Sequence, residues 1–180
     1  MEERIYALFA VVGPLVAYIS IGVSIALSPW FSWEVNALSD LGHSVKSKVA
    51  PIFNLGISMA SFLVIIYAVT SFRKHAKYTS ICLAASAFLL QLVATFDEVY
   101  GFLHFAVSVL FFISLGITSI VYAIERKSFL AVIALMIGLS SWVLYEMKVY
   151  SVGVAVPEAI STLAVASFLV YSAIKIYLSK

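Results

Sequence analysis

The sequence predicts an all-α, polytopic membrane protein: a bundle of six transmembrane helices with short loops and an outer interfacial helix between the first two spans. Of its 180 residues, 63% are hydrophobic and 11% are charged, whereas soluble domains are about 45–50% apolar and about 25% charged. Apolar stretches near the roughly 20 residues that cross a bilayer recur six times and fill the chain. Helices are expected because backbone in hydrocarbon must satisfy its own hydrogen bonds, and barrel strands would alternate over about ten residues.

The six spans belong to a single domain, 1–180, because they leave no room for a soluble one. Pro51 and Pro157 suit the first turns of the second and sixth spans. The loops between most spans are very short, so consecutive spans should be antiparallel neighbours. The spans are expected at roughly 5–27, 50–72, 78–96, 100–124, 129–145 and 156–178.

The connection 28–49 is the exception, because it is long for so economical a chain. Ser32 is a suitable N-cap and Gly42 a suitable C-terminal stop. The spacing between them predicts a short amphipathic helix within 32–41, lying at the outer mouth of the bundle. Loops of this length often carry function. The apolar face of this helix would carry Trp33, Ala37, Leu38 and Leu41.

The basic residues divide eight to three between the two faces of such a bundle, and the positive-inside rule then places both termini in the cytoplasm of a cell-membrane protein. Topology accounts for these charges, so no nucleic-acid partner is expected. Membrane lipids are the expected partners, and a homo-oligomer is left open. The inner face carries Arg4, Arg73, Lys74, Lys77, Arg126, Lys127, Lys175 and Lys180, and the outer face carries Lys46, Lys48 and Lys148.

Seven polar side chains on the outer side are candidate ligand-binding residues. Helix dipoles also favour acidic residues at helix starts, and structural hydrogen bonds would equally explain polar groups inside spans. His104 is the notable one, because an ionisable group inside a span usually faces the bundle interior and has a partner. We expect Asp40, Asn54, Asp97 and His104 to converge, since a lone polar group in hydrocarbon costs several kcal/mol. The seven are Asp40, His43, Asn54, Asp97, Glu98, His104 and Glu158.

A zinc site is also left open, built from His43, His104 and Asp40, because catalytic zinc often has three protein ligands plus water. The spacing of these residues matches no known metal signature. No catalytic residue can be assigned, so the sequence leaves open whether the protein is an enzyme.

Several short motifs resemble an uncharacterised prokaryotic family of six-helix membrane proteins, domain of unknown function number 998. They are 39–42 (SDLG), 53–56 (FNLG), 96–98 (FDE), 103–105 (LHF) and 111–112 (FF). The resemblance implies a fold and a set of polar positions but no activity. A weaker likeness to membrane hydrolases of the alkaline ceramidase type implies no activity here, because a third outer histidine is missing. The scarcity of Asn, Gln and Cys is typical of a thermophilic source, such as an archaeon.

The leading hypothesis is an outward-facing acidic and histidine-containing pocket that binds a lipid headgroup, a cation or a small polar ligand. Three alternatives stay open: a membrane-embedded, metal-assisted lipid hydrolase, a transporter of small solutes or protons, and a structural or assembly protein. The inner halves of the spans carry mostly small packing residues, which makes a continuous polar path less favoured.

The first prediction concerns topology. A cysteine introduced into 28–49 should react with a membrane-impermeant thiol reagent added from outside the cell, because the basic loops hold the other face inside. Labelling only from the cytoplasmic side would reverse the topology.

Overall fold

The structure is a computed structural model that describes residues 2–179, and the side chains of 4–179. Lys180, which was counted with the inner basic residues, lies outside this range. The described chain is helical throughout and contains no strand. The elements are α1 (Glu2–Ala7), α2 (Phe9–Ala26), η1 (Leu38–Gly42), α3 (Ala50–Tyr67), η2 (Ala68–Phe72), α4 (Arg73–His75), α5 (Lys77–Thr95), η3 (Glu98–Tyr100), α6 (Phe102–Arg126), α7 (Phe129–Glu146) and α8 (Ala155–Leu178).

Six helices in the described residues are long and apolar enough to cross a bilayer, which confirms the predicted fold class. The protein is therefore a multi-pass membrane protein. The spans begin and end within a few residues of the predicted bounds, and the second is longer because the π-helical turn η2 and α4 continue it. The spans are Arg4–Ala26, Ala50–His75, Lys77–Thr95, Phe102–Arg126, Phe129–Glu146 and Ala155–Leu178.

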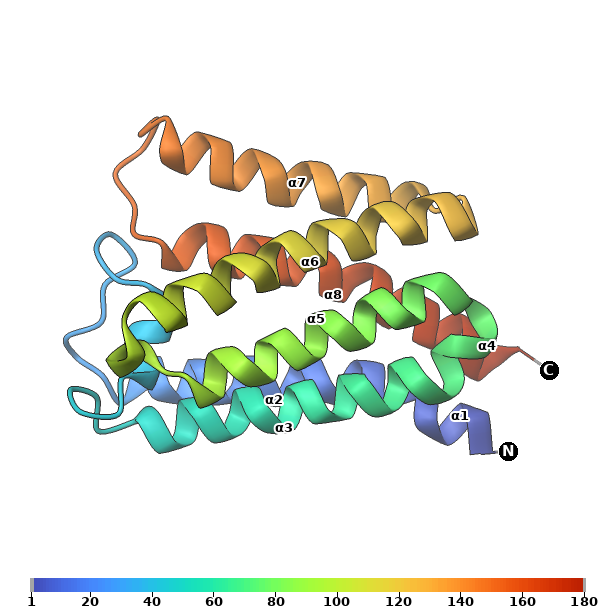
Figure 1. The fold of residues 1–180 in the computed structure, drawn as a ribbon, viewed down its shortest axis with the longest axis horizontal. Coiled ribbons are helices and arrows are strands. Elements are labelled where there is room, and N and C mark those ends of the chain that lie inside the picture. The colour runs from blue at the N-terminus through green and yellow to red at the C-terminus, as the bar shows by residue number, and fades with distance from the viewer. Residues whose placement is uncertain (1, 180) are drawn as a thin grey trace.

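The helices pack in chain order: α2 contacts α3, α3 contacts α5, α5 contacts α6, α6 contacts α7, and α7 contacts α8, while α8 also returns to α1 and α2. Figure 1 shows both termini and α4 at one end of the bundle, here called the terminal end. The opposite end, here called the cap end, carries residues 28–49, 96–101 and 147–154. Short loops cause this order, because they join antiparallel neighbours.

Aromatic side chains fill the core near the terminal end. Tyr67 stacks on Phe72, and Tyr122 stacks on Phe168, each pair with ring centroids 5.0 Å apart. The Tyr67 and Ser172 hydroxyls are 2.8 Å apart, which satisfies a buried phenol. Rings of this kind contribute large buried area and a further 0.5–1.5 kcal/mol or so per well-placed pair. This end of the bundle is therefore tightly filled.

The cap segment, residues 28–49, contains a helix, but a shorter and tighter one than the sequence predicts. It is the 3-10 helix η1, Leu38–Gly42, and residues 32–36 form a turn instead. Leu38 and Leu41 are buried as expected, whereas Trp33 is 44% exposed. Polar side chains explain why residues 32–36 are not helical. They bond to backbone N–H groups in this stretch, and these bonds compete with the hydrogen bonds of a helix. The Ser32 N–H donates to Asn36 Oδ1, and the Glu34 N–H donates to Ser32 Oγ.

Backbone contacts with the loop before α8 hold the turn in place. The Gly153 N–H donates to the Trp33 carbonyl at 2.8 Å, and the Ala155 N–H donates to the Asn36 carbonyl at 2.9 Å. The carbonyls of Trp33 and Asn36 therefore accept hydrogen bonds from the loop before α8 and not from residues of the cap segment. Gly153 is buried, and a Cβ built on it would lie 2.8 Å from the Asn36 nitrogen and closer still to the Asn36 carbonyl oxygen.

Gly153→Ala should therefore destabilise the protein and loosen the cap segment. The clash is with backbone, which cannot turn away as a side chain can, and overpacking of this kind costs about 1–3 kcal/mol. Gly22→Ala is the control, because a Cβ on Gly22 meets nothing within 4 Å. Thermal unfolding in detergent should show a lower Tm for Gly153→Ala only. Equal melting of the two variants would contradict the close packing at Gly153.

Candidate functional site

A cavity of about 990 Å³ lies among α6, α7 and α8 and reaches the cap end of the bundle. Figure 1 shows α6 close to α7 at the terminal end and diverging from it toward the cap end. Small side chains along the three helices leave the space unfilled, and ligand pockets commonly measure about 300–1,000 Å³. The small lining residues are Ser108, Gly116, Ser119, Ala134, Gly138 and Ser161.

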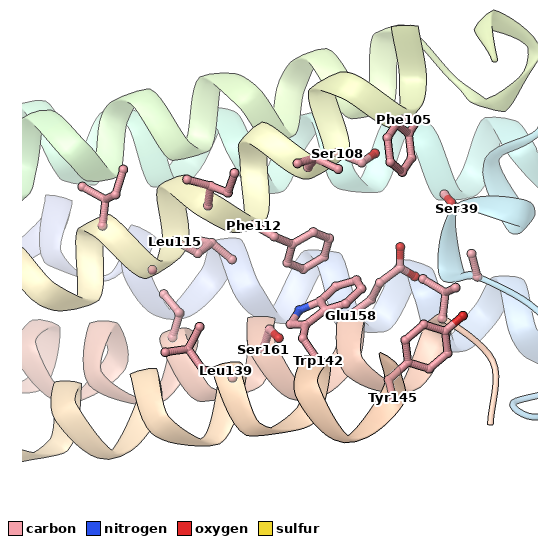
Figure 2. Close-up of a pocket in the computed structure, with 18 of the residues that line it drawn as sticks. Ser39, Phe105, Ser108, Phe112, Leu115, Leu139, Trp142, Tyr145, Glu158 and Ser161 are labelled. Carbon is pink, nitrogen blue, oxygen red and sulfur yellow. The ribbon is translucent and has the colours of Figure 1, made fainter. Parts of the chain in front are cut away.

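The cavity lining changes character along its length. Polar side chains gather at the cap end, where Figure 2 shows Ser39 and Glu158 beside each other. Farther in, the walls are mainly apolar, and Phe112 of α6 meets Trp142 of α7 edge to face at a centroid distance of 5.0 Å. Exposed lining side chains such as Phe105 and Ile113 show that the cavity is open on one side. The space is thus a groove with a polar end and an apolar length.

Two acidic side chains at the polar end hold the cap segment onto the bundle. Glu98, in η3, accepts a hydrogen bond from the Ser39 hydroxyl at 2.7 Å. Glu158, in the first turn of α8, accepts from the Leu38 N–H at 2.7 Å. Hydrogen bonds to carboxylates are about twice as strong as neutral ones. The start of η1 is therefore fastened to two different parts of the bundle.

Asp40 joins this cluster from within η1. Its Oδ2 accepts from Asn36 Nδ2 at 2.8 Å and from the Ala37 N–H at 3.0 Å, and its carboxyl hydrogen-bonds to Glu98. Burial raises the pKa of Glu98, and the bond to Asp40 raises it further. Burial also acts to raise the pKa of Asp40, but the bonds from Glu98, Asn36 and Ala37 outweigh it and lower that pKa. When the pair holds one proton, Glu98 is therefore the group that carries it, and its hydroxyl donates to the Asp40 carboxylate.

Asp97 and Asn54 support the cap segment rather than the groove. Asp97 is 8% exposed, accepts from the Val99 N–H at 2.9 Å as the N-cap of η3, and accepts from the Ser44 N–H at 3.2 Å. Burial acts to raise the pKa of Asp97, but the bonds from Ser44 and Val99 lower it overall. Asn54 Nδ2 donates to the Gly42 carbonyl at 2.8 Å, which fixes the end of η1 on α3.

The two histidines of the cap end have different surroundings. His43 Nδ1 faces its own turn, 3.4 Å from the backbone nitrogens of Val45 and Lys46. His104 is 8% exposed in α6, and its Nδ1 lies 2.7 Å from the Phe96 carbonyl oxygen. A carbonyl only accepts, so Nδ1 carries a proton and, in the neutral ring, Nε2 keeps its lone pair. That Nε2 lies 3.4 Å from Ser108 Oγ, and both residues line the groove.

The three residues of the zinc site left open by the sequence are not gathered in the structure. Within residues 2–179, no three His, Cys, Asp or Glu side chains lie close enough together to hold a metal ion. His43, His104 and Asp40 are each turned to different partners: a backbone turn, the Phe96 carbonyl and the Glu98 carboxyl. The donor atoms that zinc would need are therefore not brought to one point.

The structure thus divides the seven candidate residues into groups. Glu98, His104 and Glu158 line the groove, and Asp40 is bonded to Glu98. Asn54 and Asp97 hold the cap segment, and His43 stays within its own turn. Sequence reasoning missed the other polar lining residues, of which Ser108 could have been found, because it follows His104 by four positions on one helix face. The missed residues are Ser39, Ser108, Ser119, Trp142, Tyr145, Glu146 and Ser161.

A model of a protein family of unknown function, DUF998, matches residues 11–175 of the chain, which confirms the resemblance seen in the short motifs. No curated protein and no solved structure matches the chain.

The bond between the carboxyl groups of Asp40 and Glu98 predicts that the mobility of the cap segment depends on pH. This bond needs Asp40 ionised and Glu98 protonated, so it weakens as pH rises through the raised pKa of Glu98. It also weakens as pH falls through the lowered pKa of Asp40. A spin label at Val45, which is 78% exposed, should therefore become more mobile on the alkaline side of the Glu98 pKa.

Glu98→Gln should abolish this alkaline change, because an amide donates to Asp40 at every pH. Glu146→Gln, on another lining carboxyl, is the matched control and should leave the change in place. An alkaline increase in mobility that persists in Glu98→Gln would contradict the assignment of the proton.

Proposed function

The chain belongs to the DUF998 family of proteins of unknown function, and we propose that it binds a membrane amphiphile in the groove among α6, α7 and α8. The headgroup would lie at the polar end, beside Glu98, Glu158 and His104, and the apolar chain would lie along the remaining walls. One observation carries this proposal: a single cavity of about 990 Å³ is polar at one end and mainly apolar along its length.

The polar end must supply most of the specificity. An apolar chain that moves from the bilayer into an apolar groove gains little, because lipid tails are as apolar as leucine side chains. A headgroup, in contrast, meets fixed hydrogen-bonding groups only at the cap end. The bonds of Glu98 to Ser39 and of Glu158 to Leu38 preorganise these groups before a ligand arrives.

The chemistry of the lining favours a headgroup that donates hydrogen bonds or is cationic. The acidic side chains that line the groove in the described part of the chain are Glu98, Glu146 and Glu158, with no lysine or arginine beside them. The His104 tautomer that has its proton on Nδ1, facing the Phe96 carbonyl, adds an acceptor at Nε2. An anionic headgroup would face like charges, which is the usual way a site rejects a wrong ligand. Hydroxyl and ammonium headgroups fit best.

The cavity and the packing of the bundle give less support to two alternative functions, a transporter and a purely structural protein. A transporter needs a polar or water-filled path through the bundle, whereas the aromatic core at the terminal end is tightly filled around Tyr67, Phe72 and Phe168. A purely structural role would leave the groove without an occupant. We further propose a cell membrane of a prokaryotic, thermophilic cell as the location, with cytoplasmic termini, so that the cap end faces outward.

Filling the groove should weaken binding. A Cβ on Gly116 has its nearest contact at 3.8 Å, so Gly116→Leu is accommodated at its base and projects into the cavity. Gly22→Leu is the matched control, because Gly22 lies on α2 in open space. Native mass spectrometry with added monooleoylglycerol, oleylamine or oleate compares three headgroups on one chain length.

Gly116→Leu should bind monooleoylglycerol and oleylamine about tenfold more weakly, equivalent to about 1.4 kcal/mol, and Gly22→Leu should match the wild type. Oleate should bind the wild type least. Equal binding by the two leucine variants would contradict the groove as the site, and a preference for oleate would contradict the headgroup assignment.

A further inference from the structure

Ser108 and His104 lie together on the α6 wall of the groove. Ser108 Oγ is 3.4 Å from His104 Nε2, and His104 Nδ1 is held at 2.7 Å by the Phe96 carbonyl. This is the order of groups that activates a serine: a hydroxyl, a basic ring nitrogen and an acceptor that orients the ring. Such contacts are often long in the absence of substrate. Figure 2 shows Ser108 beside Phe105 on this wall.

Ser108 differs from the two serines that follow it on α6. Ser114 donates to the Phe111 carbonyl and Ser119 to the Leu115 carbonyl, three and four residues back. That is the ordinary way for a serine in a membrane helix to satisfy its hydroxyl. Among the described residues, the contact resolved for Ser108 Oγ is the one with the His104 ring. A serine with a purely structural role at position 108 would donate to the backbone carbonyl of residue 104, four residues back.

The carboxyl pair of Asp40 and Glu98 lies near His104, because Glu98 interacts electrostatically with the histidine. Glu98 and His104 also line the same end of the groove. A negative charge beside a histidine stabilises the imidazolium that forms for a moment when the ring takes a proton, as in a catalytic triad.

Ser108 lies between the polar end of the groove and its apolar length. It is six residues into α6 from Phe102, or roughly 9 Å along the axis, and it lines the same groove as Glu98 and Glu158. A headgroup at Glu98 and Glu158 would thus place the linkage between head and chain near Ser108.

We infer that Ser108 and His104 form a nucleophile and general base that hydrolyse a carboxylic ester of the amphiphile bound in the groove. This inference rests on the binding function proposed above, and it uses no metal ion. Ser108 Oγ bonds to the ester carbonyl carbon while His104 Nε2 takes the serine proton. The bond to the alcohol oxygen breaks, and His104 gives its proton to that oxygen. Water then attacks the acyl-serine while His104 takes its proton. The bond to Ser108 Oγ breaks, His104 gives that proton to the serine oxygen, and the fatty acid is released.

An alkyl fluorophosphonate tests the pair directly, because a serine activated in this way displaces fluoride and keeps the phosphonyl group. The intact protein in nanodiscs should be labelled on Ser108, and peptide mass spectrometry should locate the label there. Labelling should fall at least tenfold in Ser108→Ala and in His104→Gln. Glutamine can still donate to the Phe96 carbonyl, so the fold is kept while the base is lost. Ser167→Ala, at an exposed position on α8, should label as the wild type does.

A second readout separates this inference from the binding function. Wild-type protein should convert monooleoylglycerol and water into oleic acid and glycerol, whereas Ser108→Ala should still bind monooleoylglycerol without converting it. Binding without conversion or labelling in the wild type would overturn the hydrolase and leave the binding function intact. Labelling that is unchanged in His104→Gln would overturn the pairing. Failure of the wild type to bind any of the three amphiphiles would overturn both.

Discussion

The hydrogen bond between the carboxyl groups of Glu98 and Asp40 is the interaction on which the cap end depends. It joins η3, which leads into α6, to η1 in the middle of the cap segment. With the Ser39–Glu98 and Leu38–Glu158 bonds, it connects three segments that are far apart in the sequence. A partly buried carboxylate without partners would be costly, and each of these acidic side chains has a hydrogen-bond donor in the cap segment. The same groups that stabilise the cap also form the polar end of the groove.

The rest of the groove follows from helix packing. Glycines and serines on α6 and α7 bring little volume to the space between them, and α6 turns away from α7 toward the cap end (Figure 1). In a soluble protein this gap would close, because water would drive the apolar walls together. In a bilayer the surrounding lipid chains are as apolar as the walls, so no hydrophobic effect drives the walls of the gap together. An amphiphile of the membrane is the natural occupant of such a space.

Much of the fold was predictable from the sequence because the bilayer is the solvent for most of the chain. The six spans follow from apolar length, and the two ends of the bundle follow from the basic loops and from the even number of spans. His104 was predictable as an interior residue, since a lone ionisable group in hydrocarbon requires a partner. The identity of that partner, the Phe96 carbonyl, was not predictable, because any carbonyl at the right depth would serve.

The cap segment and the cavity were beyond local reasoning. Trp33 and Ala37 share a helical spacing, but Gly153 and Ala155, more than a hundred residues away, take the carbonyls that a helix would use. The candidate zinc residues are not gathered for a similar reason: Asp40 bonds to Glu98, which is distant in the sequence, and His104 Nδ1 faces the Phe96 carbonyl. Cavities depend on how helices diverge, which sequence periodicity does not encode.

An experimental structure in lipid nanodiscs would be the most direct measurement of the central claim, a groove that holds an amphiphile with its head at the cap end. Elongated density between α6 and α7, with its broad end within hydrogen-bonding distance of Glu98 or Glu158, is the predicted result. Helices α6 and α7 packed together along their full length, with no space between Phe105 and Leu139, would contradict the claim.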